Sequence, residues 1–120
     1  MRAAGARLPD DAFVVRCGLP PYHGRPLFTA CVEHPDGVFG FSVQSAVGLS
    51  VEQLASECRN RTVGVTLVGR IRGMGYDVVP TSGQGWHATV VVPKDWSQGE
   101  AERLSLLFEP VGNPAARRLP

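Results

Sequence analysis

The stretch Leu27–Gln44, LFTACVEHPDGVFGFSVQ, contains two apolar segments on either side of the tetrapeptide His34–Gly37. The tetrapeptide has proline in its second position, aspartate in its third and glycine in its fourth. This order is typical of a type I turn. The stretch therefore predicts a β-hairpin with strands over 27–33 and 38–44.

Outward from this hairpin, apolar segments rich in β-branched residues predict four more strands, over 12–17, 62–66, 76–79 and 86–92. Two predicted helices begin at capping boxes, which are Ser50 with Gln53 and Ser97 with Glu100. A third helix is expected over 67–74, where apolar residues recur at helical spacing. Thr66 is its predicted N-cap and Gly75 its predicted C-terminal stop.

The resulting order is β-β-β-α-β-α-β-β-α, in which antiparallel neighbours dominate. We therefore predict an α+β fold, with about three helices packed on one face of a mainly antiparallel sheet. A chain of 120 residues suits a single domain. We expect this domain to span 11–108, between a flexible N-terminal segment, 1–10, and a flexible C-terminal tail, 109–120.

Charge and hydropathy narrow the choice of partner and compartment. The formal net charge is only +1, so no overall field attracts the chain to nucleic acid or to an acidic membrane. No apolar run has the length of a signal peptide or a membrane span, which predicts a cytoplasmic protein without membrane contact. In that reducing compartment we expect free, mostly buried thiols at Cys17, Cys31 and Cys58.

A first candidate site combines His87 with nearby cations. Four positive charges without an intervening acid fall close together in the sequence, at Arg59, Arg61, Arg70 and Arg72. His87 stands near the start of a predicted strand and alternates with apolar residues, so it should face outward. There it could take a proton from a ribose hydroxyl while guanidinium groups neutralise a phosphate. The ordinary alternative is a half-exposed strand histidine beside a solvated basic surface.

This region resembles the small HicA-type RNA-cleaving toxins, on the residues Gly75 and Tyr76 at a helix end and Gly85–His87 at a strand start. The resemblance covers about a quarter of the chain and implies a catalytic role for His87 on RNA. The Gly-Ser-His triplet typical of those toxins is absent here. The whole chain also resembles a family of short, uncharacterised proteins from GC-rich bacteria, on 8–11, 41–45, 48–50, 66–70, 75–76, 87–90 and 113–114.

Two other patterns suggest ligands. The first contains the thiol and imidazole groups that zinc prefers, in Cys17, His23, Cys31 and His34. Their spacing matches no standard zinc module, and we predict neither a metal nor a cofactor. The second is Arg16 followed by Ser42 or Ser45, which is similar to the start of ADP-ribosyltransferase domains. That resemblance implies that Arg16 holds a phosphate and that a serine orients a ribose, although a late catalytic acid is missing.

Two functions from different classes remain. The first is a small interaction module that binds a protein partner, as one member of a toxin–antitoxin or accessory gene pair. The weakness of every catalytic pattern favours this interpretation. The second is a metal-independent enzyme that acts on RNA or a nucleotide, with His87 as acid and base.

Overall fold

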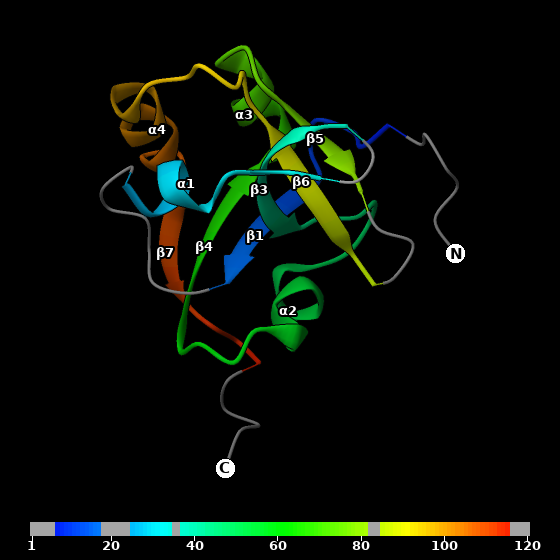
Figure 1. Cartoon of the computed structure of the whole chain (residues 1–120). Coiled ribbons are helices and arrows are strands. Elements are labelled where there is room, and N and C mark those ends of the chain that lie inside the picture. Colours follow the sequence, from blue (N-terminus) through cyan, green and yellow to red (C-terminus); the bar gives the residue numbers. More distant parts are fainter. Residues whose placement is uncertain (1–6, 18–24, 35–36, 82–84, 116–120) are drawn as a thin grey trace.

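Seven antiparallel strands form one sheet in the computed structural model, which describes residues 7–17, 25–34, 37–81 and 85–115 (Figure 1). The strands are β1 (Phe13–Cys17), β2 (Val32–Glu33), β3 (Phe39–Gln44), β4 (Thr62–Leu67), β5 (Asp77–Pro80), β6 (His87–Val91) and β7 (Glu109–Gly112). Their spatial order is β5-β6-β3-β1-β4-β7, and β2 also pairs with β3. The predicted α+β class and mainly antiparallel sheet are therefore confirmed.

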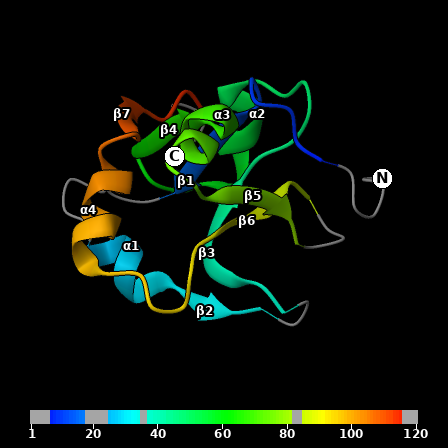
Figure 2. The ribbon, with the colours of Figure 1, turned by 90° about the horizontal axis from the view of Figure 1, so that it is seen from above.

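Four α-helices cover this sheet in the described part of the chain. They are α1 (Arg25–Ala30), α2 (Val51–Leu54), which continues as a 3-10 turn over Ala55–Glu57, α3 (Val68–Gly73) and α4 (Gln98–Ser105). Helices α1 and α4 pack side by side, as the view from above shows (Figure 2). None of these helices is long and apolar enough to cross a membrane, among the residues that the structure describes.

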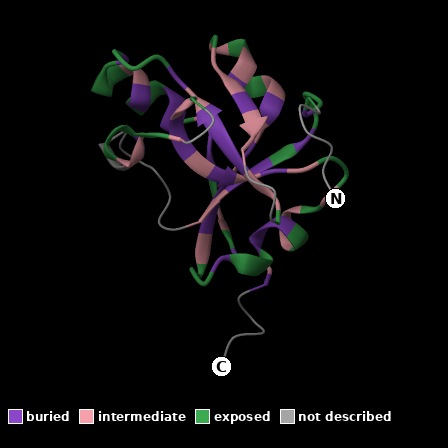
Figure 3. Cartoon of the chain, turned by 45° about the vertical axis from the view of Figure 1, so that its right-hand side comes forward, coloured by how far each residue is buried: buried purple, intermediate pink, exposed green. Residues whose placement is uncertain are grey.

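The core has two parts, one on each face of the sheet. Successive residues of β1 enter different parts because side chains alternate along a strand. Val14 packs in the larger cluster with Phe41 and with Leu104 of α4, whereas Val15 packs with Leu54 of α2. Helix α2 thus lies opposite the other three helices, rather than beside them as predicted. Figure 3 shows the buried residues concentrated in the central part of the sheet.

The predicted strand over 27–33 is largely wrong, because helix α1 occupies its first part and only Val32–Glu33 are extended. A short apolar run does not distinguish a buried helix from a strand. Leu27 is fully buried in the larger cluster, and this packing decides in favour of the helix. The central residues of the predicted turn, 35 and 36, lie outside the described residues, and the Gly37 N–H donates to the His34 carbonyl at 2.9 Å.

Helix ends follow the sequence in most cases. Both capping boxes are present, and Gly75 has a φ of +93°, the left-handed conformation that ends α3. The prediction of Thr66 as N-cap is wrong: Thr66 is buried in β4, and α3 begins after Leu67 without a side-chain cap. Strand β4 therefore runs directly into α3.

The predicted domain boundary at 108 leaves out β7, which pairs with β4 along Glu109–Gly112. The buried side chain of Asn113 then donates to the carbonyls of Cys58, at 3.1 Å, and of Asn60, at 2.9 Å. These bonds attach 109–115 to the domain. The segment looked loose in the sequence because a two-proline, polar composition does not reveal an edge strand.

Cys17 and Cys58 form a disulfide, so the prediction of three free thiols is wrong for this pair. Their Cα atoms lie 5.3 Å apart, although 41 positions separate them in the sequence. The bond joins the end of β1 to the segment between α2 and β4. Cys31 keeps its thiol, and burial raises the pKa of that thiol to about 11.

Candidate functional site

A polar pocket of about 190 Å³ opens where β1 and β3 separate. The pairing of these strands is limited to Val15 opposite Gln44, because β2 takes the other end of the same β3 edge. The pocket is lined by Val15, Arg16, Cys17, Ser42, Val43, Gln44 and His87. We call it the strand-gap pocket.

Arg16 fills part of the gap between the two strands. Its Nη1 donates to the Ser42 carbonyl at 2.6 Å, and its guanidinium carbon lies 5.5 Å from the centre of the Phe41 ring. The side chain forms no ion pair with a carboxylate of the described residues. Burial lowers the pKa of Arg16, because a partly desolvated cation is less stable than a hydrated one. Among the described residues, this half-buried positive charge therefore has no carboxylate partner.

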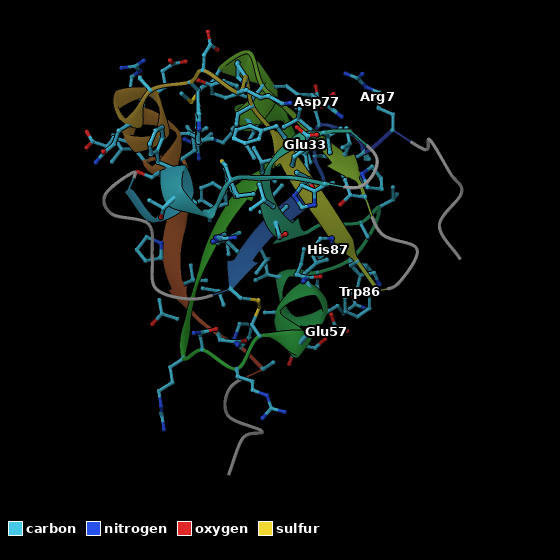
Figure 4. The ribbon with its side chains drawn as sticks, in the orientation of Figure 1. Arg7, Glu33, Glu57, Asp77, Trp86 and His87 are labelled. Atoms are coloured by element: carbon cyan, nitrogen blue, oxygen red, sulfur yellow. A yellow bond between two sulfur atoms is a disulfide. The ribbon has the colours of Figure 1, made fainter. Side chains whose placement is uncertain are left out.

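Gln44 and His87 face each other across β3 and β6. The Oε1 of Gln44 is buried and has no hydrogen-bond partner among the described residues. The His87 Nδ1 lies 3.3 Å from the Thr81 hydroxyl, which in turn is 2.8 Å from the hydroxyl of Thr89. These contacts orient the imidazole at the start of β6, next to Trp86 (Figure 4).

The proposed arginine partners of His87 lie elsewhere. Arg72 donates to Asp10 at 2.7 Å and to Asp77 at 2.8 Å. Asp77 pairs with Val91, at the opposite end of β6 from His87. Four residues of a strand span roughly 13 Å. Arg72 therefore serves an ion-pair network, and Arg70 is exposed on the same helix.

Arg59 and Arg61 are exposed in the connection between α2 and β4. Strand β4 lies three places from β6 in the sheet, which corresponds to roughly 14 Å between strand axes. The strand that follows Arg61 therefore lies well to the side of His87. Arg16, from the second sequence pattern, is the arginine that shares a pocket with His87.

One of the four residues in the zinc hypothesis is not available as a ligand. Cys17 is bonded to Cys58 and offers no thiolate, and His23 lies outside the described residues. In the part of the chain that the structure describes, no three or more His, Cys, Asp or Glu side chains gather as a metal site. The Cys31 thiol donates to the Leu27 carbonyl at 3.3 Å, as a packed cysteine does.

The pattern similar to ADP-ribosyltransferases is brought together only in part. Arg16 meets Ser42 through the main-chain carbonyl of the serine, and Ser45 is buried, with its hydroxyl donating to the Phe13 carbonyl. No acid is among the described residues that line the strand-gap pocket. Glu100 is used in its capping box and accepts from the Tyr76 hydroxyl at 2.9 Å.

A second hollow, of about 430 Å³, lies at the other end of β1. Its lining residues are Pro9, Asp11, Ala12, Phe13, Val47, Gly48, Leu49, Ser50 and Gln53. We call it the apolar hollow, because Phe13 and Val47 remain 38% and 64% exposed beside it. The sequence analysis missed both residues. The run AFVVRC is apolar at nearly every position and does not show which side chain stays outside.

Hydrogen bonds hold the walls of this hollow in place. The buried Ser45 hydroxyl donates to the Phe13 carbonyl at 2.6 Å and fixes the end of β3 against β1. On the other side, Ser50 and Gln53 exchange the two bonds of the capping box, at 2.9 and 3.1 Å. These bonds fix the positions of the walls of the hollow.

Comparisons with family models, with curated proteins and with solved structures give no match.

Proposed function

We propose that this chain is a small bacterial interaction module that binds a protein partner through the apolar hollow. The observation that carries the proposal is the exposure of Phe13 and Val47 around a preformed depression. Single exposed apolar residues are normal on a protein surface, but a group of them around a hollow is typical of an interface. The partner belongs, in this proposal, to a toxin–antitoxin or accessory gene pair.

The chemistry of the hollow defines the partner segment. Phe13, Val47 and Leu49 offer an apolar surface to one large aliphatic or aromatic side chain. Asp11 is exposed on the rim and would pair with a lysine or arginine of the partner. We therefore expect a peptide segment with an apolar anchor close to a basic residue. The fixed walls lower the entropy cost of binding.

A displayed peptide library tests this while the partner is still unidentified. Selection on the wild-type protein should enrich an apolar anchor next to a basic residue, and the selected peptides should bind Val47→Gln more weakly. Leu106→Gln is the matched control, because Leu106 is 75% exposed but lies at the end of α4. Peptides that bind the Val47→Gln variant as well as the wild type would contradict the proposal.

The neighbouring gene product is the second probe. Its affinity, measured by titration calorimetry, should fall roughly 10-fold or more in Phe13→Ser and Val47→Gln, since a buried apolar anchor commonly contributes more than 1 kcal/mol. The Leu106→Gln variant should bind as the wild type does. Equal binding by all four proteins would move the interface away from the hollow.

The cytoplasmic location is part of the same proposal, and the disulfide bears on it. Disulfides persist mainly in oxidising compartments, so the Cys17–Cys58 bond argues against a reducing cytoplasm. Thiol trapping with a heavy maleimide in intact cells decides the matter. Modification of all three cysteines supports the cytoplasm, whereas modification of Cys31 alone shows that the bond exists where the protein resides.

An enzyme acting on RNA or a nucleotide is the second candidate, because His87 shares the strand-gap pocket with Arg16. An imidazole beside a guanidinium can move a proton while the charge of a phosphate is neutralised. Induction of the wild type should then arrest bacterial growth, and His87→Ala should not. Arrest by both proteins at equal expression would exclude the histidine mechanism.

A further inference from the structure

The strand-gap pocket has an electrostatic imbalance. Arg16 is half-buried, and its Nη1 donates to a neutral carbonyl, that of Ser42, at 2.6 Å. A guanidinium has five N–H donors, and the described residues occupy one of those of Arg16 through this bond. The Phe41 ring compensates part of the charge from one side. A partly buried cation without a counter-ion favours an anion at the same place.

The remaining lining supports the same sign of charge. His87 adds an imidazole that can donate a hydrogen bond, and the described lining contains neither Asp nor Glu. Asp77 lies at the other end of β6 and accepts from Arg72 at 2.8 Å, whereas the Glu57 carboxylate lies near Gly85, just before β6. An anion in the pocket would thus meet hydrogen-bond donors and no carboxylate among the described lining residues.

Gln44 adds a different requirement. Its Oε1 is buried without a hydrogen-bond partner among the described residues, and such an orphan acceptor costs roughly 1–3 kcal/mol. A ligand that carries a hydroxyl would satisfy it. The pocket therefore suits a molecule with an anionic group and a hydroxyl group a few atoms apart, rather than a simple ion.

The volume limits the size of this molecule. A space of about 190 Å³ equals that of about six water molecules in the liquid. Inorganic phosphate alone would leave part of the pocket unfilled. A phosphate ester of a small sugar would fill it, and the larger remainder of a nucleotide would stay outside.

We infer that the strand-gap pocket binds the phosphate monoester of a small polyhydroxy compound, of the size of ribose phosphate. In this arrangement Arg16 pairs with the phosphate, His87 donates to it, and the Gln44 carbonyl accepts from a sugar hydroxyl. The site is separate from the proposed protein interface, because the two hollows share no lining residue. It therefore stands or falls independently of the interaction-module proposal.

Titration calorimetry with ribose 5-phosphate, ribose and inorganic phosphate tests the inference on the full chain. We expect ribose 5-phosphate to bind more tightly than inorganic phosphate, and ribose not to bind. Arg16→Met keeps the length of the side chain and should weaken ribose 5-phosphate roughly 10- to 100-fold, as expected for lost hydrogen bonds to a charged group. Arg70→Met, at an exposed arginine, is the matched control and should have no effect.

Gln44→Leu separates the roles of the two ends of the ligand. It should weaken ribose 5-phosphate roughly 5-fold, through loss of one neutral hydrogen bond, and leave inorganic phosphate unchanged. Since Arg16→Met removes a bond between strands, Arg16→Lys, which keeps the charge, is measured beside it with thermal unfolding as the folding control. Binding that survives both Arg16→Met and Gln44→Leu, or failure of millimolar ribose 5-phosphate to bind the wild type, would overturn the inference.

Discussion

The two ends of β1 differ in chemistry although the strand is only five residues long. At its first residue, Phe13 borders the apolar hollow, with Val47 exposed opposite and an aspartate on the rim. At its last two residues, Arg16 and Cys17 border a polar pocket without a carboxylate in the described lining. The difference arises from the neighbouring strand.

At the Phe13 end, the buried Ser45 hydroxyl donates to the Phe13 carbonyl and joins β1 to the segment that follows β3. No gap opens between the strands there, and side chains form the surface of the hollow. At the Arg16 end, β2 displaces β1 from β3, so main-chain groups and a guanidinium line an opening. The comparison teaches that one strand can serve two kinds of ligand when its pairing changes along its length. Variants that alter one end and spare the other test this separation.

Removal of the disulfide should have the largest effect. In Cys17→Ala combined with Cys58→Ala, the unfolded chain gains the entropy of a loop of 41 positions, which costs about 4 kcal/mol of stability. Denaturant unfolding of the variant, with reduced wild type as control, measures this cost. Because Cys17 lines the strand-gap pocket, binding of ribose 5-phosphate should also weaken, whereas peptide binding at the hollow should persist. A variant as stable as the oxidised wild type would contradict the assigned bond.

Arg72→Met should affect the opposite end of β1. The side chain of Arg72 is only 13% exposed, and it donates to the Leu8 carbonyl at 2.6 Å and to Asp10 at 2.7 Å. These acceptors are sequence neighbours of Pro9 and Asp11, which line the apolar hollow. Loss of these charged hydrogen bonds should cost roughly 1–3 kcal/mol. Peptide affinity at the hollow should fall and ribose 5-phosphate affinity should not. Arg70→Met is again the control, and a reversed pattern would refute the separation of the two sites.

Gln44→Leu should have a smaller effect on stability, and of opposite sign. Replacement of an orphan buried acceptor by an apolar side chain of similar size should raise the free energy of unfolding by up to about 1 kcal/mol. Thermal and denaturant unfolding of this variant beside the wild type measure the change. A gain in stability together with weaker ribose 5-phosphate binding would identify Gln44 as a residue kept for a ligand. A clear loss of stability would show that its amide is needed for the fold.

The smallest effect concerns pH. Partial burial opposes ionisation of Asp77, but the hydrogen bond and charge of Arg72 hold its pKa below the usual value. The network therefore contributes fully above the unfolded pKa, near 4, and its contribution is lost as the pH falls through the lower folded pKa. Asp77→Asn should flatten the stability curve between about pH 5 and 2. An unchanged curve would show that the ion pair contributes little.

Local signals in the sequence predicted much of the fold. The two capping boxes at Ser50 and Ser97 need only residues within one turn, and Gly75 needs only its own φ. Strands β1, β3, β4, β5 and β6 lie within two residues of their predicted bounds. The exceptions, α1 and β7, are short segments whose conformation depends on what they pack against.

The candidate sites were harder to predict from the sequence than the fold. His87, Arg16 and Ser42 were recognised singly, but the pocket that joins Arg16 to His87 depends on the order of strands, which no spacing reveals. Gln44, Phe13 and Val47 carried no signal at all. Their importance comes from an orphan acceptor and from exposure, and both are properties of the packed surroundings.

The amino-acid sequence by itself determined the α+β class, the antiparallel sheet and most helix ends, since hydrophobic periodicity, turn residues and caps act over a few neighbouring positions. Only the tertiary structure decided that Cys17 meets Cys58 across 41 positions, that α2 covers the opposite face, and that β2 separates β1 from β3. These features depend on long-range packing, in which each segment competes for the same buried surface. The strand-gap pocket and the apolar hollow both result from this competition.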